Sequence, residues 1–168
     1  MLQIFNKIFA TGLLTEPLPP PPEIVRLGTA LQQEVAARFR TSLAIRMVDA
    51  GSCNGCELEM HAVNNSFYDI ERFGIHFVAS PRHADLLLVT GVVSRHMQTA
   101  LLRTYAATPE PKLVVAMGDC AVTGGEFGLS YASCGPVANV IPVDLTIPGC
   151  PPTPLALLQG LLALTKPG

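Results

Sequence analysis

The chain has 168 residues, a formal net charge of −2 and five cysteines. This length fits one domain with a sizeable core, and the lack of a basic block argues against nucleic acid as a partner. No apolar stretch approaches the roughly 20 residues of a membrane-spanning helix. Charged residues make up only 14% of the sequence, against about 25% in a typical soluble domain. We therefore expect partner subunits to cover much of the surface.

The cellular location follows from two further patterns. We find no secretion signal at the start of the chain and no twin-arginine pair, so we expect the protein to stay in the cytoplasm. The cytoplasm is reducing, and five cysteines there indicate metal binding rather than disulfides.

Residues 1–41 are expected to form an N-terminal extension. Apolar residues at helical spacing, such as Phe5, Ile8 and Phe9, predict a short amphipathic helix. This helix either covers the domain's own core or docks on a membrane subunit or in the lipid interface. Pro17 and the prolines at 19–22 predict a stiff spacer, and a second helix follows from about residue 23 to residue 40.

Residues 42–168 form the predicted main domain, in which strands and helices alternate. Strands are expected at 43–48, 75–78, 85–90 and 112–117, with a last extended run at 140–147. Helices are expected at about 55–73, 94–107 and 153–164. This alternation predicts an α/β fold, with a flavodoxin-like parallel sheet and helices on both faces.

Four of the cysteines follow strands of this predicted sheet. Cys53 and Cys56 form Cys-Asn-Gly-Cys after the first strand, Cys120 lies in Gly-Asp-Cys, and Cys150 lies in Pro-Gly-Cys-Pro-Pro. The carboxyl ends of parallel strands meet at one edge, where such sheets bind ligands. Four thiols should therefore meet, and a cubane iron–sulfur cluster needs four thiolates.

Other interpretations of these thiols remain open. A CxxC pair alone also fits a redox dithiol or half of a zinc site, and zinc binds four thiolates in tetrahedral geometry. Zinc sites usually pair two CxxC motifs, whereas this chain has one such motif and two isolated cysteines. A zinc-stabilised scaffold without an electron-transfer role is thus an alternative.

Three further residues, Cys134, Glu57 and Glu59, indicate a function less clearly than the four cysteines do. Cys134 does not follow a strand end as the other cysteines do, so we interpret it as a buried structural residue. Glu57 and Glu59 follow the CxxC pair at the start of a helix, where negative charge is favoured by the helix dipole. We interpret Glu59 as a candidate proton relay beside a redox centre.

Four segments of the sequence carry a resemblance to a known family: 49–60 (DAGSCNGCELEM), 80–91 (SPRHADLLLVTG), 118–125 (GDCAVTGG) and 148–154 (PGCPPTP). They resemble the small, electron-transfer subunit of membrane-bound nickel–iron hydrogenases such as formate hydrogenlyase. They also resemble the related 20 kDa subunit of complex I. The resemblance covers about residues 42–164.

The resemblance implies one [4Fe–4S] cluster next to the active site of a larger subunit. Its ligands would be Cys53, Cys56, Cys120 and Cys150, and Cys134 has no ligand role in that pattern. Glu59 falls where the complex I relatives carry a glutamate near the cluster. The complex I subunit typically has adjacent cysteines at the first position, so the CxxC pair of this chain favours the hydrogenase type.

The implied partners are a nickel–iron large subunit, a ferredoxin-like iron–sulfur subunit and integral membrane subunits. The alternative partner for a complex I-like NADH or ferredoxin:quinone oxidoreductase is a 49 kDa-like subunit without nickel ligands. In either case the resemblance implies a peripheral subunit on the cytoplasmic side of the inner membrane.

Overall fold

The structure, a computed structural model, describes residues 22–39 and 42–165. The amphipathic helix predicted over residues 1–14 and the proline segment up to residue 21 lie outside the described residues. In the described parts of the chain, no helix is both long enough and apolar enough to cross a membrane.

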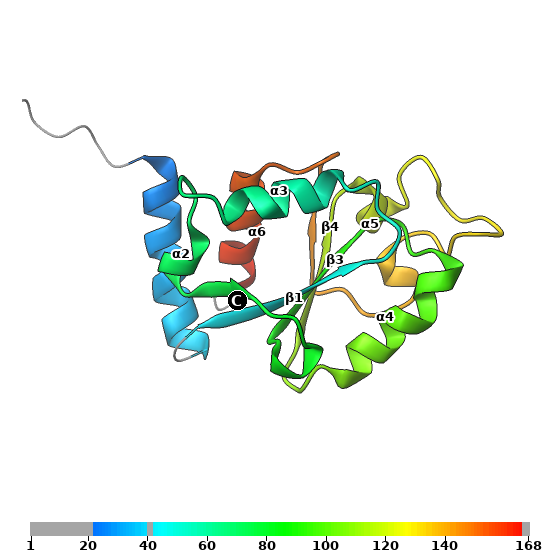
Figure 1. The fold of residues 1–168 in the computed structure, drawn as a ribbon, viewed down its shortest axis with the longest axis horizontal. Coiled ribbons are helices and arrows are strands. Elements are labelled where there is room, and N and C mark those ends of the chain that lie inside the picture. Colours follow the sequence, from blue (N-terminus) through cyan, green and yellow to red (C-terminus); the bar gives the residue numbers. More distant parts are fainter. Residues whose placement is uncertain (1–21, 40–41, 166–168) are drawn as a thin grey trace, which may run out of the picture.

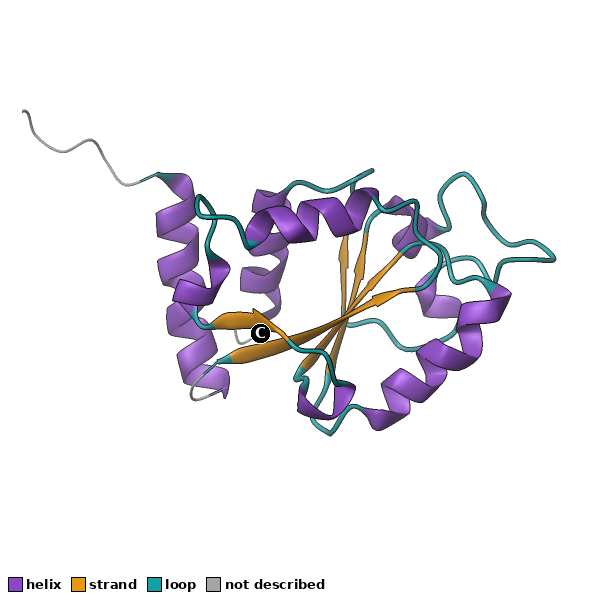
Figure 2. Cartoon of the chain, viewed as in Figure 1, coloured by secondary structure: helices purple, strands orange, loops and turns teal. Residues whose placement is uncertain are grey.

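A five-stranded parallel sheet forms the centre of the molecule, as Figure 2 shows. Its strands in chain order are β1 (Leu43–Asp49), β2 (Ile75–Phe77), β3 (Leu86–Thr90), β4 (Leu113–Met117) and β5 (Leu145–Ile147). The spatial order is β2-β1-β3-β4-β5, and each neighbouring pair is parallel. This is the flavodoxin-like order, so the predicted fold class is confirmed.

Helices cover both faces of the sheet (Figure 1). One face packs against α2 (Glu23–Phe39), α3 (Gly55–Val63) and α6 (Pro154–Thr165). The other face packs against α4 (Arg95–Ala107) and α5 (Asp119–Thr123). Every residue of the central strand β3 is buried, as its unbroken apolar sequence predicts for a strand covered on both faces.

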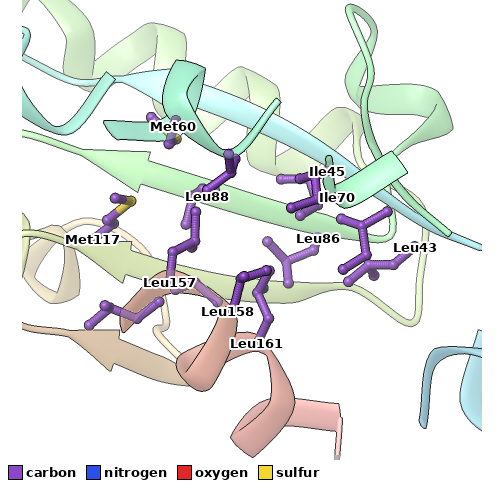
Figure 3. Packing of buried hydrophobic residues seen from close by; sticks show 14 of the residues in the cluster. Leu43, Ile45, Met60, Ile70, Leu86, Leu88, Met117, Leu157, Leu158 and Leu161 are labelled. Atoms are coloured by element: carbon purple, nitrogen blue, oxygen red, sulfur yellow. The ribbon is translucent and has the colours of Figure 1, made fainter. Parts of the chain in front are cut away.

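The larger hydrophobic cluster lies between the sheet and α6. Leu86 and Leu88 of β3 face Leu157, Leu158 and Leu161 of α6 in this cluster (Figure 3). Each of these five side chains is at most 1% exposed. Burying one leucine contributes about 1.5–3 kcal/mol, so this cluster anchors the strands whose ends form the site.

One predicted helix ends earlier, and one predicted strand begins later, than the sequence indicated. The helix predicted over 55–73 ends at Val63, because the Asn65 side chain accepts the amides of Phe67 and Tyr68 and forms a turn. A short 3₁₀ helix, η1 (Ile70–Phe73), follows. In the run at 140–147, only Leu145–Ile147 joins the sheet.

Just before β5, hydrogen bonds of Asp144 rather than strand pairing attach the chain to β4. Asp144 accepts the amide of Val114 at 2.7 Å, and its own amide donates to the carbonyl of Val114. These bonds tie the residue before β5 to β4, where the strand pairing then begins at Leu145.

Candidate metal centre

The four cysteines predicted as ligands lie at one edge of the sheet. Cys53 lies in the loop after β1, and Cys56 lies in the first turn of α3. Cys120 lies in α5, directly after β4, and Cys150 lies in the loop after β5. The strands are parallel, so their carboxyl ends bring these loops to the same side of the molecule.

The four cysteines line one cavity of about 120 Å³. The loop residues that share its wall include Ser52, Gly55, Gly91, Asp119, Gly149 and Pro151. Cys53 and Cys150 are exposed, whereas Cys56 is buried and Cys120 is half-buried. The cavity therefore has a buried inner wall and an open outer rim.

A network of hydrogen bonds fixes the loop that carries Cys53. The Asp49 carboxylate, at the end of β1, accepts the amides of Gly51 and Ser52 at 2.9 and 2.8 Å. The Ser52 hydroxyl accepts the amide of Asn54 at 3.0 Å and donates to Glu57 at 2.6 Å. The turn between the two cysteines of the CxxC pair is thus held from both ends.

Asp119 connects the loops that carry the other two cysteines. Its carboxylate accepts the amide of Gly149 at 2.8 Å, and its amide donates to the Gly149 carbonyl at 2.9 Å. Asp119 precedes Cys120 and Gly149 precedes Cys150 in the sequence. This double contact holds together the residues that directly precede Cys120 and Cys150.

Two glycines leave space directly beside the sulfur atoms. A Cβ atom on Gly118 would lie 2.6 Å from the sulfur of Cys56, and one on Gly125 would lie 2.8 Å from the sulfur of Cys120. Real Cβ atoms do not approach sulfur this closely. Both positions have positive φ angles, 91° and 50°, which glycine adopts without strain. The backbone at these two positions therefore approaches the sulfurs more closely than a residue with a side chain would allow.

The thiols oppose one another's ionisation. Burial raises the pKa of Cys56 to about 12, and the negative charge of Glu57 and the neighbouring Cys53, Cys120 and Cys150 add to this increase. Burial also raises the pKa of Cys120, helped by Cys150, Cys53 and Asp119. Thiolates bind metals and thiols do not, so four thiolates here require positive charge between them.

The spacing of the donors differs from that of a single-ion site. Within residues 22–39 and 42–165, no three His, Cys, Asp or Glu side chains lie close enough to coordinate one ion. A zinc ion holds four sulfurs at about 2.3 Å from one point. In an iron–sulfur cluster each thiolate binds a different iron, so the four sulfurs stand around a wider core.

Glu57 has a structural role that the sequence did not reveal. It is only 5% exposed, and its carboxylate accepts hydrogen bonds from Ser52 and from the buried Thr90 of β3. It thereby joins the CxxC turn to the centre of the sheet. Acidic residues are common in the first turn of a helix, so this bridge could not be predicted from the sequence pattern.

Glu59 and Cys134 lie apart from this network. Glu59, the predicted proton relay, is half-buried and makes no hydrogen bond or ion pair with any residue that the structure describes. Cys134 is 5% exposed and packs in the hydrophobic cluster on the opposite face of the sheet, with Val93 and Val137. Its sulfur is not part of the cysteine cavity.

The fold and the site together define an α/β protein with a cysteine-lined cavity at the carboxyl edge of its parallel sheet. The family described as NADH ubiquinone oxidoreductase, 20 Kd subunit, matches residues 53–164. The chain belongs to this family.

Two relatives of the chain are named as enzyme subunits. The chain is 41% identical to formate hydrogenlyase subunit 7 of Escherichia coli over 85% of its own length, but it spans only 56% of that protein. It is 48% identical to probable membrane-bound hydrogenase subunit mbhJ of Pyrococcus furiosus, over 71% of this chain and 72% of the relative.

A solved structure has a similar fold. It is a chain from the membrane-bound sulfane sulfur reductase, an archaeal respiratory membrane complex. The TM-score is 0.66 at 36% identity, covering 80% of this chain and 73% of the other. The resemblance inferred from the sequence motifs is thus confirmed at the level of the family.

Proposed function

We propose that this chain is the electron-transfer subunit of a membrane-associated nickel–iron hydrogenase complex. It would hold one [4Fe–4S] cluster through Cys53, Cys56, Cys120 and Cys150. The observation that carries this proposal is the single cavity that these four cysteines line, although they are spread over the three segments that follow β1, β4 and β5. The bound cluster would accept and release one electron at a time.

The residues around the cavity suit this role. Gly118 and Gly125 let the backbone lie close to two of the sulfurs, which a side chain at either position would displace. Asp49 and Asp119 fix the loops before a cluster binds, so little conformational entropy is lost on binding. Burial of Cys56 excludes water from the inner wall, and solvent exposure is one determinant of cluster potential.

The proposed partners follow from the position of the cavity and from the relatives. Cys53 and Cys150 are exposed at its rim, so a docked large subunit would seal the cluster from solvent. We place the nickel–iron site in that subunit. A ferredoxin-like subunit would exchange electrons with the cluster, and integral membrane subunits would hold the complex on the cytoplasmic side of the inner membrane.

Glu59 stays our proposed proton relay. Its half-buried position lets it exchange protons with solvent. The pH–rate profile of the complex carrying Glu59→Gln tests this role. We expect a lower rate with an altered pH dependence, and an unchanged profile would contradict it.

A second candidate function is the equivalent subunit of a complex I-like oxidoreductase. The family name and the similar chain from the sulfane sulfur reductase complex both favour it. The large partner would then lack nickel.

The two candidates are separated by purifying the complex anaerobically and measuring its metals. For either, we expect broad visible absorption that bleaches on reduction, with iron and sulfide present. Nickel in the co-purified large subunit supports the hydrogenase, and its absence supports the second candidate. A colourless chain with one zinc ion would contradict both and support a zinc-stabilised scaffold.

A further inference from the structure

A second cavity lies beside the cysteine cavity, at the outer edge of β1. Its volume is about 270 Å³. Strand β2 pairs with β1 only as far as Ile45, so residues 46–49 of β1 have no strand neighbour on that side. The cavity occupies this open edge, between β1, α3 and the segment that follows β2.

The lining combines apolar walls with a few polar groups. Met60 and Phe77 are among its apolar residues. Its polar residues are Arg46, Glu57, His61 and Asn64. An apolar pocket with a few convergent polar groups is the usual form of a small-ligand site.

Arg46 is the unusual member of this lining. Its Nε is buried and has no hydrogen-bond partner, and no other buried side-chain nitrogen or oxygen in the described residues lacks one. An unsatisfied buried donor of this kind is unfavourable, and more so when the group is charged. A ligand can accept this hydrogen bond, and remove the penalty, once the side chain turns so that Nε faces the cavity.

Among the residues that the structure describes, none forms an ion pair with Arg46. The one ion pair found in the described residues joins Lys112 to Glu110, far from this cavity in the sequence. Glu57 also lines the cavity, but its two carboxylate oxygens already accept from Ser52 and Thr90. Arg46 therefore lines the cavity without an ion-pair partner in the described part of the chain.

The geometry points to a binding site for a carboxylate at this open edge of β1, with Arg46 as the residue that binds it. A guanidinium matches the two oxygens of a carboxylate with two parallel hydrogen bonds. The neighbouring His61 and Asn64 are further polar groups for the same ligand, and Met60 and Phe77 suit an apolar body attached to the acid. The acid is either a free organic acid or an acidic side chain of a docked subunit.

Benzoate is a suitable probe, because it joins a carboxylate to an apolar ring. Benzamide is its neutral analogue of similar shape. We titrate both into the purified full-length chain by calorimetry at equal ionic strength. A charged hydrogen bond is worth about 1.5–3 kcal/mol, so we expect benzoate to bind at least about tenfold more tightly than benzamide.

Two variants assign the preference to Arg46. Arg46→Gln should remove the difference between the two probes, and Arg46→Lys should reduce it while keeping the charge. Arg95→Gln, which changes an exposed arginine outside the cavity, should leave the difference intact. Equal affinity of wild type for benzoate and benzamide would overturn the proposal, as would an unchanged preference in Arg46→Gln. The wild-type comparison decides the question even if Arg46→Gln does not fold.

The same titration on the assembled complex separates the two sources of the acid. If the complex still prefers benzoate, the site is open to free organic acids. If the isolated chain binds benzoate and the complex does not, a subunit already supplies the carboxylate. Benzoate binding at Arg46 does not require the cluster. The titration therefore tests the carboxylate site separately from the proposed function.

Discussion

Glu57 is the residue on which the inner side of the cysteine site depends. It is buried and accepts hydrogen bonds from Ser52 in the CxxC turn and from Thr90 in β3. Glu57→Ala would leave the buried Thr90 hydroxyl with only a 3.4 Å contact to the Val48 carbonyl. We expect the free energy of unfolding to fall by about 1–3 kcal/mol, as measured by urea denaturation.

Glu59→Ala is the matched control for this prediction. Glu59 lies on the same helix but is half-buried and makes no hydrogen bond with the residues that the structure describes. Its loss should change the free energy of unfolding by no more than about 0.5 kcal/mol. Equal effects of the two substitutions would contradict the bridging role of Glu57.

The cysteines of the cavity should differ in reactivity when no metal is bound. Cys53 and Cys150 are exposed, whereas Cys56 is buried and its pKa is raised to about 12. Alkylation requires the thiolate, so iodoacetamide at pH 8 should label Cys53 and Cys150 well before Cys56. Raising the pH toward 12 should speed the labelling of Cys56, because its thiolate fraction rises. Mass spectrometry of timed samples measures the order, and early labelling of Cys56 at pH 8 would contradict it.

At the scale of elements, the contact between α2 and η1 depends on one glycine. A Cβ atom at Gly28 would overlap the ring of Phe73. In an exposed helix, alanine is more favourable than glycine by about 1 kcal/mol. At this position we expect the reverse: Gly28→Ala should destabilise the fold by about 1–3 kcal/mol through overpacking.

Urea denaturation measures this effect, with Gln33→Ala on the exposed side of the same helix as the control. Adding Phe73→Leu to Gly28→Ala makes room for the new methyl group, so the two changes should be less destabilising together than their sum. Additive effects would show that the ring and the glycine do not pack as described.

Most elements could be predicted because their signals are local. The strand at β3 is an unbroken apolar run, and α4 is capped by Ser94, whose hydroxyl accepts the amide of Met97. The predicted helix over 55–73 was too long, because the apolar spacing continues past Val63 while Asn65 forms a turn. The apolar spacing of a sequence does not depend on a single side-chain hydrogen bond, so the end of the helix at Val63 could not be predicted from that spacing.

At the scale of the whole molecule, the position of the cysteine site could be predicted from topology. Parallel strands bring their carboxyl ends together, and Cys53, Cys120 and Cys150 each follow such an end. The roles of Glu57 and Arg46 could not be predicted in this way. They depend on contacts between elements: a bond from α3 to β3, and an edge of β1 that β2 leaves uncovered.

The whole fold also explains why Cys134 should be dispensable for cluster binding. Cys134 lies on the opposite face of the sheet from the larger cluster and is absent from the cysteine cavity. A serine there replaces a small buried side chain without removing a proposed ligand.

The central claim is that these scattered thiols hold one cluster, and iron content per chain tests it most directly. Wild type and Cys134→Ser, purified anaerobically within the complex, should each contain about four irons for this cluster, after the irons of the other subunits are subtracted. Cys120→Ser should lose most or all of them. Loss of this iron in Cys134→Ser and its retention in Cys120→Ser would contradict the account.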